Sequence, residues 1–288
     1  MCRLAFYLGP PLTLSQLVTD PEHSIIQQSY HAREREEPLN GDGYGLGWYN
    51  HRVSARPAVL REVQPAWSSL NLSGLAGATE SDCILAHVRA ASPGIGVSQA
   101  NCHPFSAGRL SFMHNGLVAG YQRIRRDLKE RLSDRCYDLI SGSTDSEVLF
   151  ASIVEHLGDP TGEIKLEAMA DAVEAVIGLV EETAQRAGSR ETAHLNLVLT
   201  DGAQAVVSRY GTPNGTRSQS LYHHLGGRYR CRDGVCEMLD DPDSRTVLFA
   251  SEPLSADAGW KTVPDNALML IDAEHNVTSR PIEPVRLL

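Results

Sequence analysis

The second residue of the chain is a cysteine, and its position gives it a specific chemical option. If Met1 is removed, Cys2 carries both a thiol and a free α-amine. The α-amine has an ordinary pKa of roughly 7.7–8.0 and the thiol one of roughly 8.5, so the amine can accept the thiol proton near neutral pH. Cys2 could then act as an N-terminal nucleophile with its own general base. For this residue taken alone, a chance cysteine is the alternative.

A second feature is the pair Asn115-Gly116, which closes the apolar stretch that begins at Phe112. A side-chain amide beside an unhindered backbone N–H can stabilise the oxyanion that forms when a nucleophile attacks a carbonyl group. An ordinary Asn-Gly turn would use the same two residues and is the alternative interpretation.

Two charged side chains could bind the two ends of an amino acid. Arg89 ends an apolar segment, and a buried arginine can bind a carboxylate through two parallel hydrogen bonds. Asp145 begins a predicted helix and could receive a substrate ammonium group. The alternatives are a structural ion pair for Arg89 and a helix-capping carboxylate for Asp145.

Short strands must position these residues, and the sequence predicts them from apolar runs bounded by Gly, Pro, Asn or Asp. The predicted strands span residues 3–8, 44–49, 58–63, 84–89, 110–114, 195–200, 205–210, 246–250 and 268–271. Helices are predicted at 123–132, at 148–156 after a capping box that starts at Thr144, and over about five turns from Leu166. Strands dominate without regular strand–helix alternation, which favours an α+β layered fold over a doubly wound sheet.

The composition excludes several classes of protein. The 288 residues have a formal net charge of −10, which disfavours a nucleic-acid binder, and 42% hydrophobic residues are ample for a core. No apolar run approaches the roughly 18 residues of a membrane span. The apolar stretch at the N-terminus stops at Gly9-Pro10, so we expect no signal peptide and a cytoplasmic location.

The cysteines are too sparse for a disulfide scaffold, and we expect a reducing environment. Cys231 and Cys236 flank Asp233-Gly234, so two thiols on either side of a hairpin turn are expected. Half a zinc site is the alternative, with His223-His224 just upstream, but no second pair of ligands follows at the right spacing. We therefore expect neither a metal nor a cofactor.

The order of the motifs along the chain combines these separate signals. The sequence resembles the class II glutamine amidotransferases, which are N-terminal-nucleophile hydrolases. The resemblance is strong over residues 2–160 and looser beyond. The matching segments are Cys2, 40–45, 87–92, 101–105, 114–116 and 144–147. Segments 24–30, 41–49 and 250–254 are similar to small stand-alone members of the family. Those members include the amidotransferase-like subunit of a fungal glutathione-degradation complex and an ergothioneine-pathway γ-glutamyl amidohydrolase.

The resemblance implies a fold and a role for each site residue. The fold would be a four-layer αββα sandwich, formed by a single type-2 domain over residues 1–288 with a short C-terminal extension at about 255–288. Cys2 would be the nucleophile, and the Asn115 side chain and the Gly116 N–H would form the oxyanion hole. Arg89, with the Ser92 hydroxyl, would bind the α-carboxylate of the substrate. Asp145 would bind its α-ammonium group.

The implied activity is hydrolysis of a γ-glutamyl amide bond through a thioester on Cys2, releasing glutamate. Glutamine, glutathione and a γ-glutamyl thiol metabolite are the expected substrates. One alternative is a glutaminase subunit that passes ammonia to a separate partner, since a separate peptidase or synthase subunit fits the resemblance. Others are an N-terminal-nucleophile amidase for different amides and a catalytically silent scaffold. Retention of Met1 would cap the amine of Cys2 and remove its base.

The sequence also departs from the family pattern. His103 stands where many synthase-linked relatives carry a glutamine, and Ala90-Ala91 lacks the bulky residue that often follows the arginine. Both differences concern the fit of the pocket to free glutamine.

Overall fold

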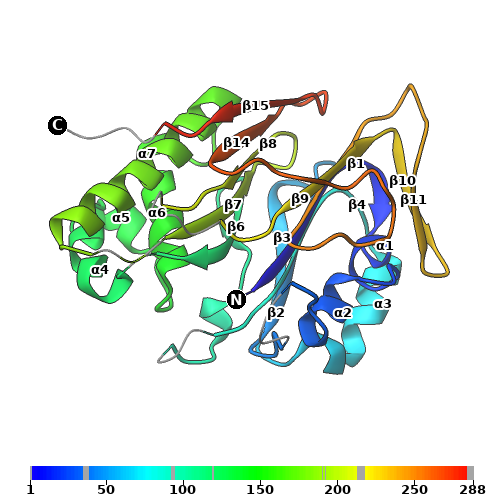
Figure 1. Cartoon of the computed structure of the whole chain (residues 1–288), viewed down its shortest axis with the longest axis horizontal. Helices are drawn as coiled ribbons and strands as arrows, with labels where there is room; N and C mark the ends of the chain where they lie inside the picture. The colour runs from blue at the N-terminus through cyan, green and yellow to red at the C-terminus, as the bar shows by residue number, and fades with distance from the viewer. Residues whose placement is uncertain are drawn as a thin grey trace.

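Two β-sheets lie face to face, and helices cover the outer face of each (Figure 1). The computed structural model describes residues 2–34, 39–91, 95–118, 120–189, 191, 193–212 and 218–283. This arrangement is the predicted α+β fold with four αββα layers. It forms because each sheet has two apolar faces, one for the other sheet and one for its helices.

The first sheet has seven strands in the order β13-β9-β12-β1-β4-β2-β3. Its central strand β1 pairs antiparallel with both β4 and β12. The strands are β1 (Arg3–Thr13), β2 (Tyr44–Asn50), β3 (Ser54–Glu62), β4 (Glu80–Val88), β9 (Tyr222–Gly226), β12 (Thr246–Ala250) and β13 (Lys261–Thr262). The chain therefore places the residue after Cys2 on a central strand.

The second sheet has six strands in the order β15-β14-β8-β7-β6-β5, and all its neighbours are antiparallel. The strands are β5 (Phe105–Ala107), β6 (Leu110–Leu117), β7 (His194–Thr200), β8 (Ala205–Arg209), β14 (Ala267–Ile271) and β15 (Val277–Pro281). Asn115 and Gly116 lie near the end of β6, so the expected nucleophile and the expected oxyanion hole come from different sheets.

Three apolar clusters hold the four layers together. The inner one joins the sheets and contains Leu4 and Phe6 of β1 and Met113 of β6. The second packs the six-stranded sheet against α4 (Tyr121–Lys129), α5 (Asp134–Tyr137), α6 (Asp145–Leu157) and α7 (Leu166–Arg186). The third packs the seven-stranded sheet against α1 (Ser15–Val18), α2 (Ile25–Tyr30) and α3 (Leu70–Ala78).

All the predicted strands and helices are present, with ends that differ by a few residues. The capping box at the start of α6 is confirmed, because Thr144 Oγ1 accepts a hydrogen bond from Glu147 N and Glu147 Oε2 accepts one from Thr144 N. The prediction missed short elements, among them β5, β9, β13, β15 and the helices α1–α3. The strands β13 and β5, with two and three residues, carry too little periodicity to be identified from sequence.

The hairpin of β10 (Arg228–Arg232) and β11 (Val235–Leu239) corrects one expectation. Its turn is the predicted Asp233-Gly234, with φ of 51° and 81°. The register places Cys231 directly opposite Cys236, with Cα atoms 4.0 Å apart, and the two form a disulfide instead of the expected thiols. A sequence separation of five residues does not reveal this pairing, whereas the strand register does.

Within the described residues, no helix is both long enough and apolar enough to cross a membrane.

Candidate active site

Cys2 lies directly before β1, beside the end of β4. The antiparallel register pairs Arg3 with Val88, so Cys2 is opposite the residues that follow β4. The Cys2 thiol is half-buried and lies 3.4 Å from the backbone nitrogen of Ala90 and 3.6 Å from its carbonyl oxygen. The expected nucleophile and Arg89 are therefore brought together by one strand pairing.

Arg89 is a buried cation at this position, only 3% exposed. Its guanidinium group donates to the carbonyl oxygens of Asp42, at 3.3 Å, and Gly96, at 3.4 Å. It forms no ion pair with a carboxylate in the described part of the chain. A buried guanidinium bonded to neutral carbonyl groups retains the capacity to bind a carboxylate. Ser92, expected to assist Arg89, lies outside the described residues.

Asn115 is fully buried on β6 and reaches across to the other sheet. Its Nδ2 atom donates to Ser251 Oγ at 3.0 Å, and the same oxygen accepts a hydrogen bond from Leu4 N at 3.0 Å. Asn115 Oδ1 is buried and forms no hydrogen bond with any described residue. The side chain expected in the oxyanion hole is thus linked to β1 two residues after Cys2.

Gly116 follows Asn115 at a point where no side chain fits. A Cβ atom there would lie 1.8 Å from the carbonyl oxygen of His194 and 2.6 Å from His114 Nε2. Glycine is therefore required by the close approach of the His194 carbonyl group on β7.

Asp145 is the first residue of α6, and its carboxylate is partly exposed. Oδ2 accepts a hydrogen bond from Val118 N at 2.8 Å, and Oδ1 accepts one from Ser146 N at 2.8 Å. The helix N-terminus favours this negative charge. The N-cap of α6 is Thr144, so Asp145 is not the capping residue. Asp145 lies beside the end of β6, where a role in binding an ammonium group stays a prediction.

Asn101 connects the regions of Arg89 and Asp145. Its Nδ2 donates at 2.9 Å to the Gly96 carbonyl oxygen that also accepts from Arg89, and its Oδ1 accepts from Ser143 N at 2.9 Å. Asn101 is 2% exposed. Sequence reasoning included this residue in a motif without giving it a role, because its link to Ser143 joins segments 42 residues apart.

Glu252 is a second functional candidate, and it lies in segment 250–254, to which sequence reasoning gave no role. It is 1% exposed and accepts hydrogen bonds from Arg3 Nε at 2.7 Å, His23 Nε2 at 2.8 Å and Arg33 N at 2.8 Å. Burial alone would raise the pKa of this carboxyl group, but these hydrogen bonds and the Arg3 charge lower it to about 2. Glu252 is therefore an anion that holds the residue next to Cys2.

Three histidines are buried beside the site. Burial lowers the pKa of His87 to about 3, holds that of His103 well below its ordinary value, and also lowers that of His114. The rings of His87 and His103 have centroids 4.2 Å apart. These imidazoles are neutral at pH 7, and one with a pKa near 3 is too weak a base to activate a thiol.

The other unbridged thiols are poor candidates for the nucleophile. Burial raises the pKa of Cys83, Cys102 and Cys136, which lowers the thiolate fraction of each at neutral pH. Cys2 differs because its thiol is only half-buried.

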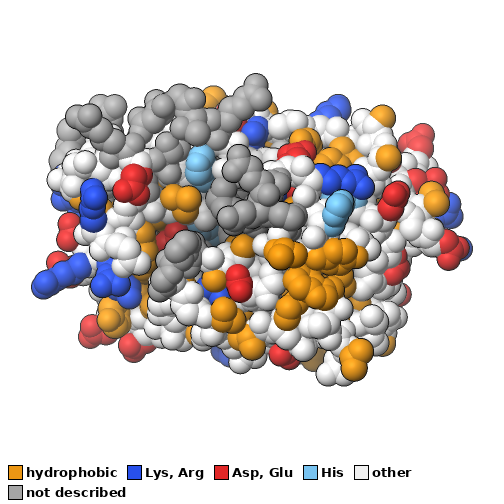
Figure 2. Space-filling view, turned by 60° about the horizontal axis from the view of Figure 1, so that its bottom comes forward, with side chains coloured by type: hydrophobic (Ala, Val, Ile, Leu, Met, Phe, Trp, Pro, Cys, Tyr) orange, Lys and Arg blue, Asp and Glu red, His pale blue; other side chains and the backbone are white. Residues whose placement is uncertain are grey.

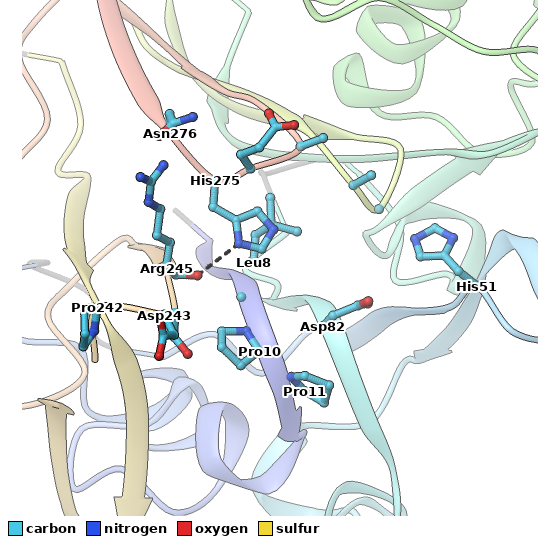
Figure 3. A pocket seen from close by; sticks show the side chains of 16 residues that line it. Leu8, Pro10, Pro11, His51, Asp82, Pro242, Asp243, Arg245, His275 and Asn276 are labelled. Atoms are coloured by element: carbon cyan, nitrogen blue, oxygen red, sulfur yellow. Dashed lines mark hydrogen bonds between the residues drawn. The ribbon is translucent and has the colours of Figure 1, made fainter. Parts of the chain in front are cut away.

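A pocket of about 810 Å³ lies at the opposite end of β1 (Figure 3). It is lined by residues 8–11 of β1 and by side chains that include His51, Asp82, Arg245 and His275. None of the expected site residues lines it, so the candidate active site is elsewhere. Within the described residues, no group of three or more His, Cys, Asp or Glu side chains is arranged to hold a metal ion.

The facing sheets, with a cysteine at the start of a central strand, define a fold of the N-terminal-nucleophile hydrolase type. The sequence pattern of the class II glutamine amidotransferases matches residues 14–283. The chain belongs to this family of enzymes.

Individual relatives agree with this assignment. The chain is 36% identical to the probable glutamine amidotransferase DUG3 of Saccharomyces cerevisiae, over 94% of this chain and 82% of the relative. It is 29% identical to the gamma-glutamyl-hercynylcysteine sulfoxide hydrolase of Mycolicibacterium smegmatis, over 97% of this chain and 99% of the relative. Among solved structures, a glutamine aminotransferase class-II domain protein from Silicibacter pomeroyi is similar, with a TM-score of 0.66, 26% identity and coverage of 98% and 100%.

Proposed function

We propose that this enzyme hydrolyses a γ-glutamyl amide bond, with Cys2 as the nucleophile. The observation that supports this most directly is the convergence at the start of β1. There the Cys2 thiol contacts the residue after Arg89, and Asn115 is linked to Leu4 through Ser251. The names of the two relatives support the same chemistry, since one is a glutamine amidotransferase and the other a γ-glutamyl hydrolase.

In the first step the α-amine of Cys2, exposed after removal of Met1, takes the thiol proton. Sγ attacks the γ-carbonyl carbon, and the N–H groups of Asn115 and Gly116 stabilise the oxyanion. When the carbonyl re-forms, the C–N bond breaks and the α-ammonium of Cys2 gives its proton to the leaving nitrogen, which departs as an amine or ammonia. A γ-glutamyl thioester remains on Cys2.

In the second step a water molecule gives a proton to the same amine and attacks the thioester. The C–S bond breaks, glutamate leaves, and the α-ammonium returns its proton to the sulfur, which restores the thiol and the free amine. Using one base for both steps requires only that the amine lie beside the sulfur, which residue 2 ensures by its own covalent structure.

Arg89 and Asp145 account for the choice of a glutamyl group. Arg89, with the Ser92 hydroxyl, would bind the α-carboxylate of the substrate, and Asp145 would bind its α-ammonium. An apolar acyl group would use neither charge, which disfavours an amidase for other amides.

The single type-2 domain with a short C-terminal extension and the cytoplasmic location are part of this proposal. Residues 255–283 supply β13 to one sheet and β14 and β15 to the other, which supports one domain.

A glutaminase that passes ammonia to a separate peptidase or synthase subunit is the second candidate. Figure 2 shows the lower side of Figure 1, where hydrophobic side chains gather in a patch. Tyr30 of α2 and Trp67 are 38% and 43% exposed, and their ring centroids lie 5.8 Å apart. Exposed aromatic groups of this kind are typical of interaction surfaces and favour a partner.

Glutamate release tests the proposal. The purified protein is incubated with glutamine, glutathione and a panel of γ-glutamyl amides, and mass spectrometry determines whether residue 2 is the first residue. We expect release from at least one substrate and none from Cys2→Ala. No release from any substrate, with Cys2 at the terminus, would contradict hydrolysis by this chain alone and favour the partner-dependent or silent alternatives.

A further inference from the structure

Ser251, directly after β12, occupies a position between the two sheets. It is fully buried, and its Oγ accepts hydrogen bonds from Leu4 N on β1 and from Asn115 Nδ2 on β6, both at 3.0 Å. Its own backbone is fixed to β1 as well, since Ser251 N donates to the Leu4 carbonyl oxygen at 2.9 Å. One hydroxyl group therefore links the strand of the nucleophile to the strand of the oxyanion hole.

Such a link serves a physical need of this fold. The two sheets meet through apolar side chains, such as Leu4, Phe6 and Met113, and apolar contact is not directional. Catalysis requires its donors in place to within roughly 0.5 Å, and a displacement of about 1 Å can cost about 100-fold in rate. A directional hydrogen bond between the sheets supplies the accuracy that apolar packing does not.

The two polar atoms of the Asn115 amide differ in their contacts. Nδ2 donates to Ser251 Oγ, and Oδ1 is buried without a hydrogen-bond partner among the described residues. A serine hydroxyl can accept from an N–H group or donate to a carbonyl oxygen. If the amide turns by 180°, Oδ1 and Nδ2 exchange places. Ser251 Oγ then donates to Oδ1, and Nδ2 is able to donate a hydrogen bond to an oxyanion.

We infer that Ser251 is a positioning residue that orients the Asn115 amide in the oxyanion hole. This inference rests on the proposed function, because it assigns Ser251 a part in the same hydrolysis. Ser251 acts through Asn115 and touches no reacting atom, so its loss should change kcat and leave substrate binding unchanged.

The test compares Ser251→Ala with a matched control, Ser81→Ala. Ser81 is also buried and bonds to the backbone of Tyr49 and Cys83, but it lies at the far end of β4 from Cys2. We expect S251A to lower kcat for glutamate release roughly 10- to 100-fold, with KM changed less than about three-fold. S81A should keep the wild-type kcat, and alkylation of Cys2 by iodoacetamide, which forms no oxyanion, should be equally fast in all.

The double variant N115A/S251A separates positioning from an independent effect. If Ser251 acts through Asn115, the double variant has the kcat of Asn115→Ala within about two-fold. If S251A does not fold, Ser251→Cys, with a weaker hydrogen-bonding group of similar size, should give a kcat between those of wild type and N115A.

Three results would overturn the inference while the proposed function stands: an active wild type with an unchanged S251A, multiplicative losses in the double variant, or an equal loss in S81A. A wild type that releases no glutamate would instead overturn the proposed function, and the positioning role with it.

Discussion

Arg3 and Glu252 form a buried ion pair in which Nε and Oε1 lie 2.7 Å apart, with side chains 2% and 1% exposed. Arg3 Nη1 also donates to the carbonyl oxygen of Cys2 at 3.0 Å. Glu252 therefore acts on the position of the nucleophile through its neighbour in the chain. The next residue back, Ser251, contacts Asn115, so adjacent residues after β12 contact both halves of the proposed site.

Replacing Glu252 with glutamine should destabilise the protein strongly. Arg3 would remain buried without a counter-charge, and losing one partner of such a pair typically costs about 3 kcal/mol or more. Urea unfolding measures the change. The control is Glu237→Gln, which breaks the half-exposed pair with Arg230 and should cost less than about 1 kcal/mol. Equal unfolding midpoints for E252Q and the wild type would show that the pair contributes nothing to stability.

Stability should fall as the pH decreases below 6.5. Burial lowers the pKa of His87 from 6.5 to about 3 in the folded chain, so between these values the unfolded chain binds a proton that the folded chain does not. This contribution to the free energy of unfolding is fully present above pH 6.5. It is lost as the pH falls to 3, at about 1.4 kcal/mol per pH unit. Glu252 adds a second loss between pH 4.5 and about 2, since its pKa is lowered on folding.

Urea unfolding at several pH values checks the histidine contribution. His87→Gln should give a shallower decline between pH 6.5 and 4.5, because glutamine can still donate to the His114 carbonyl oxygen but does not titrate. His51→Gln, at an exposed position, should leave the slope unchanged. A slope identical to wild type in H87Q would contradict the assignment of this loss to His87.

Asn115→Ala should lower kcat by about 100- to 1000-fold, because one donor to the oxyanion is removed. KM should change little, since the oxyanion exists only in the transition state. Steady-state glutamate release measures both constants. A raised KM with kcat intact would place Asn115 in substrate binding instead.

Arg89→Lys should mainly raise KM, by about 10-fold or more. A lysine keeps the charge but loses the planar fork that binds a carboxylate through two hydrogen bonds. The same kinetic assay, with a substrate that contains the free α-carboxylate, measures the effect. An unchanged KM would remove Arg89 from the substrate site.

Most of the fold could be predicted because its long strands are apolar runs with clear ends. The strand β12 was predicted at 246–250, as observed, and α6 was identified by its capping box. Short elements such as β13, with two residues, escaped because no period fits so few positions.

Some residues of the candidate site could likewise be predicted from the sequence, and others could not. Cys2, Arg89 and Asn115 could be named from residue types and their order along the chain. Ser251 and Glu252 could not, because their partners are more than 100 residues away and only the pairing of the strands brings them together. The Cys231–Cys236 disulfide was missed for a related reason, since it depends on hairpin register and not on spacing.

Covalent labelling tests the central claim most directly. The protein is incubated with a glutamine-mimicking electrophile, digested, and the modified residue is located by mass spectrometry. The account predicts one adduct on the sulfur of Cys2, in a chain whose first residue is Cys2, and protection by a γ-glutamyl substrate. An adduct on Cys102, or glutamate release by a chain that still carries Met1, would contradict the account.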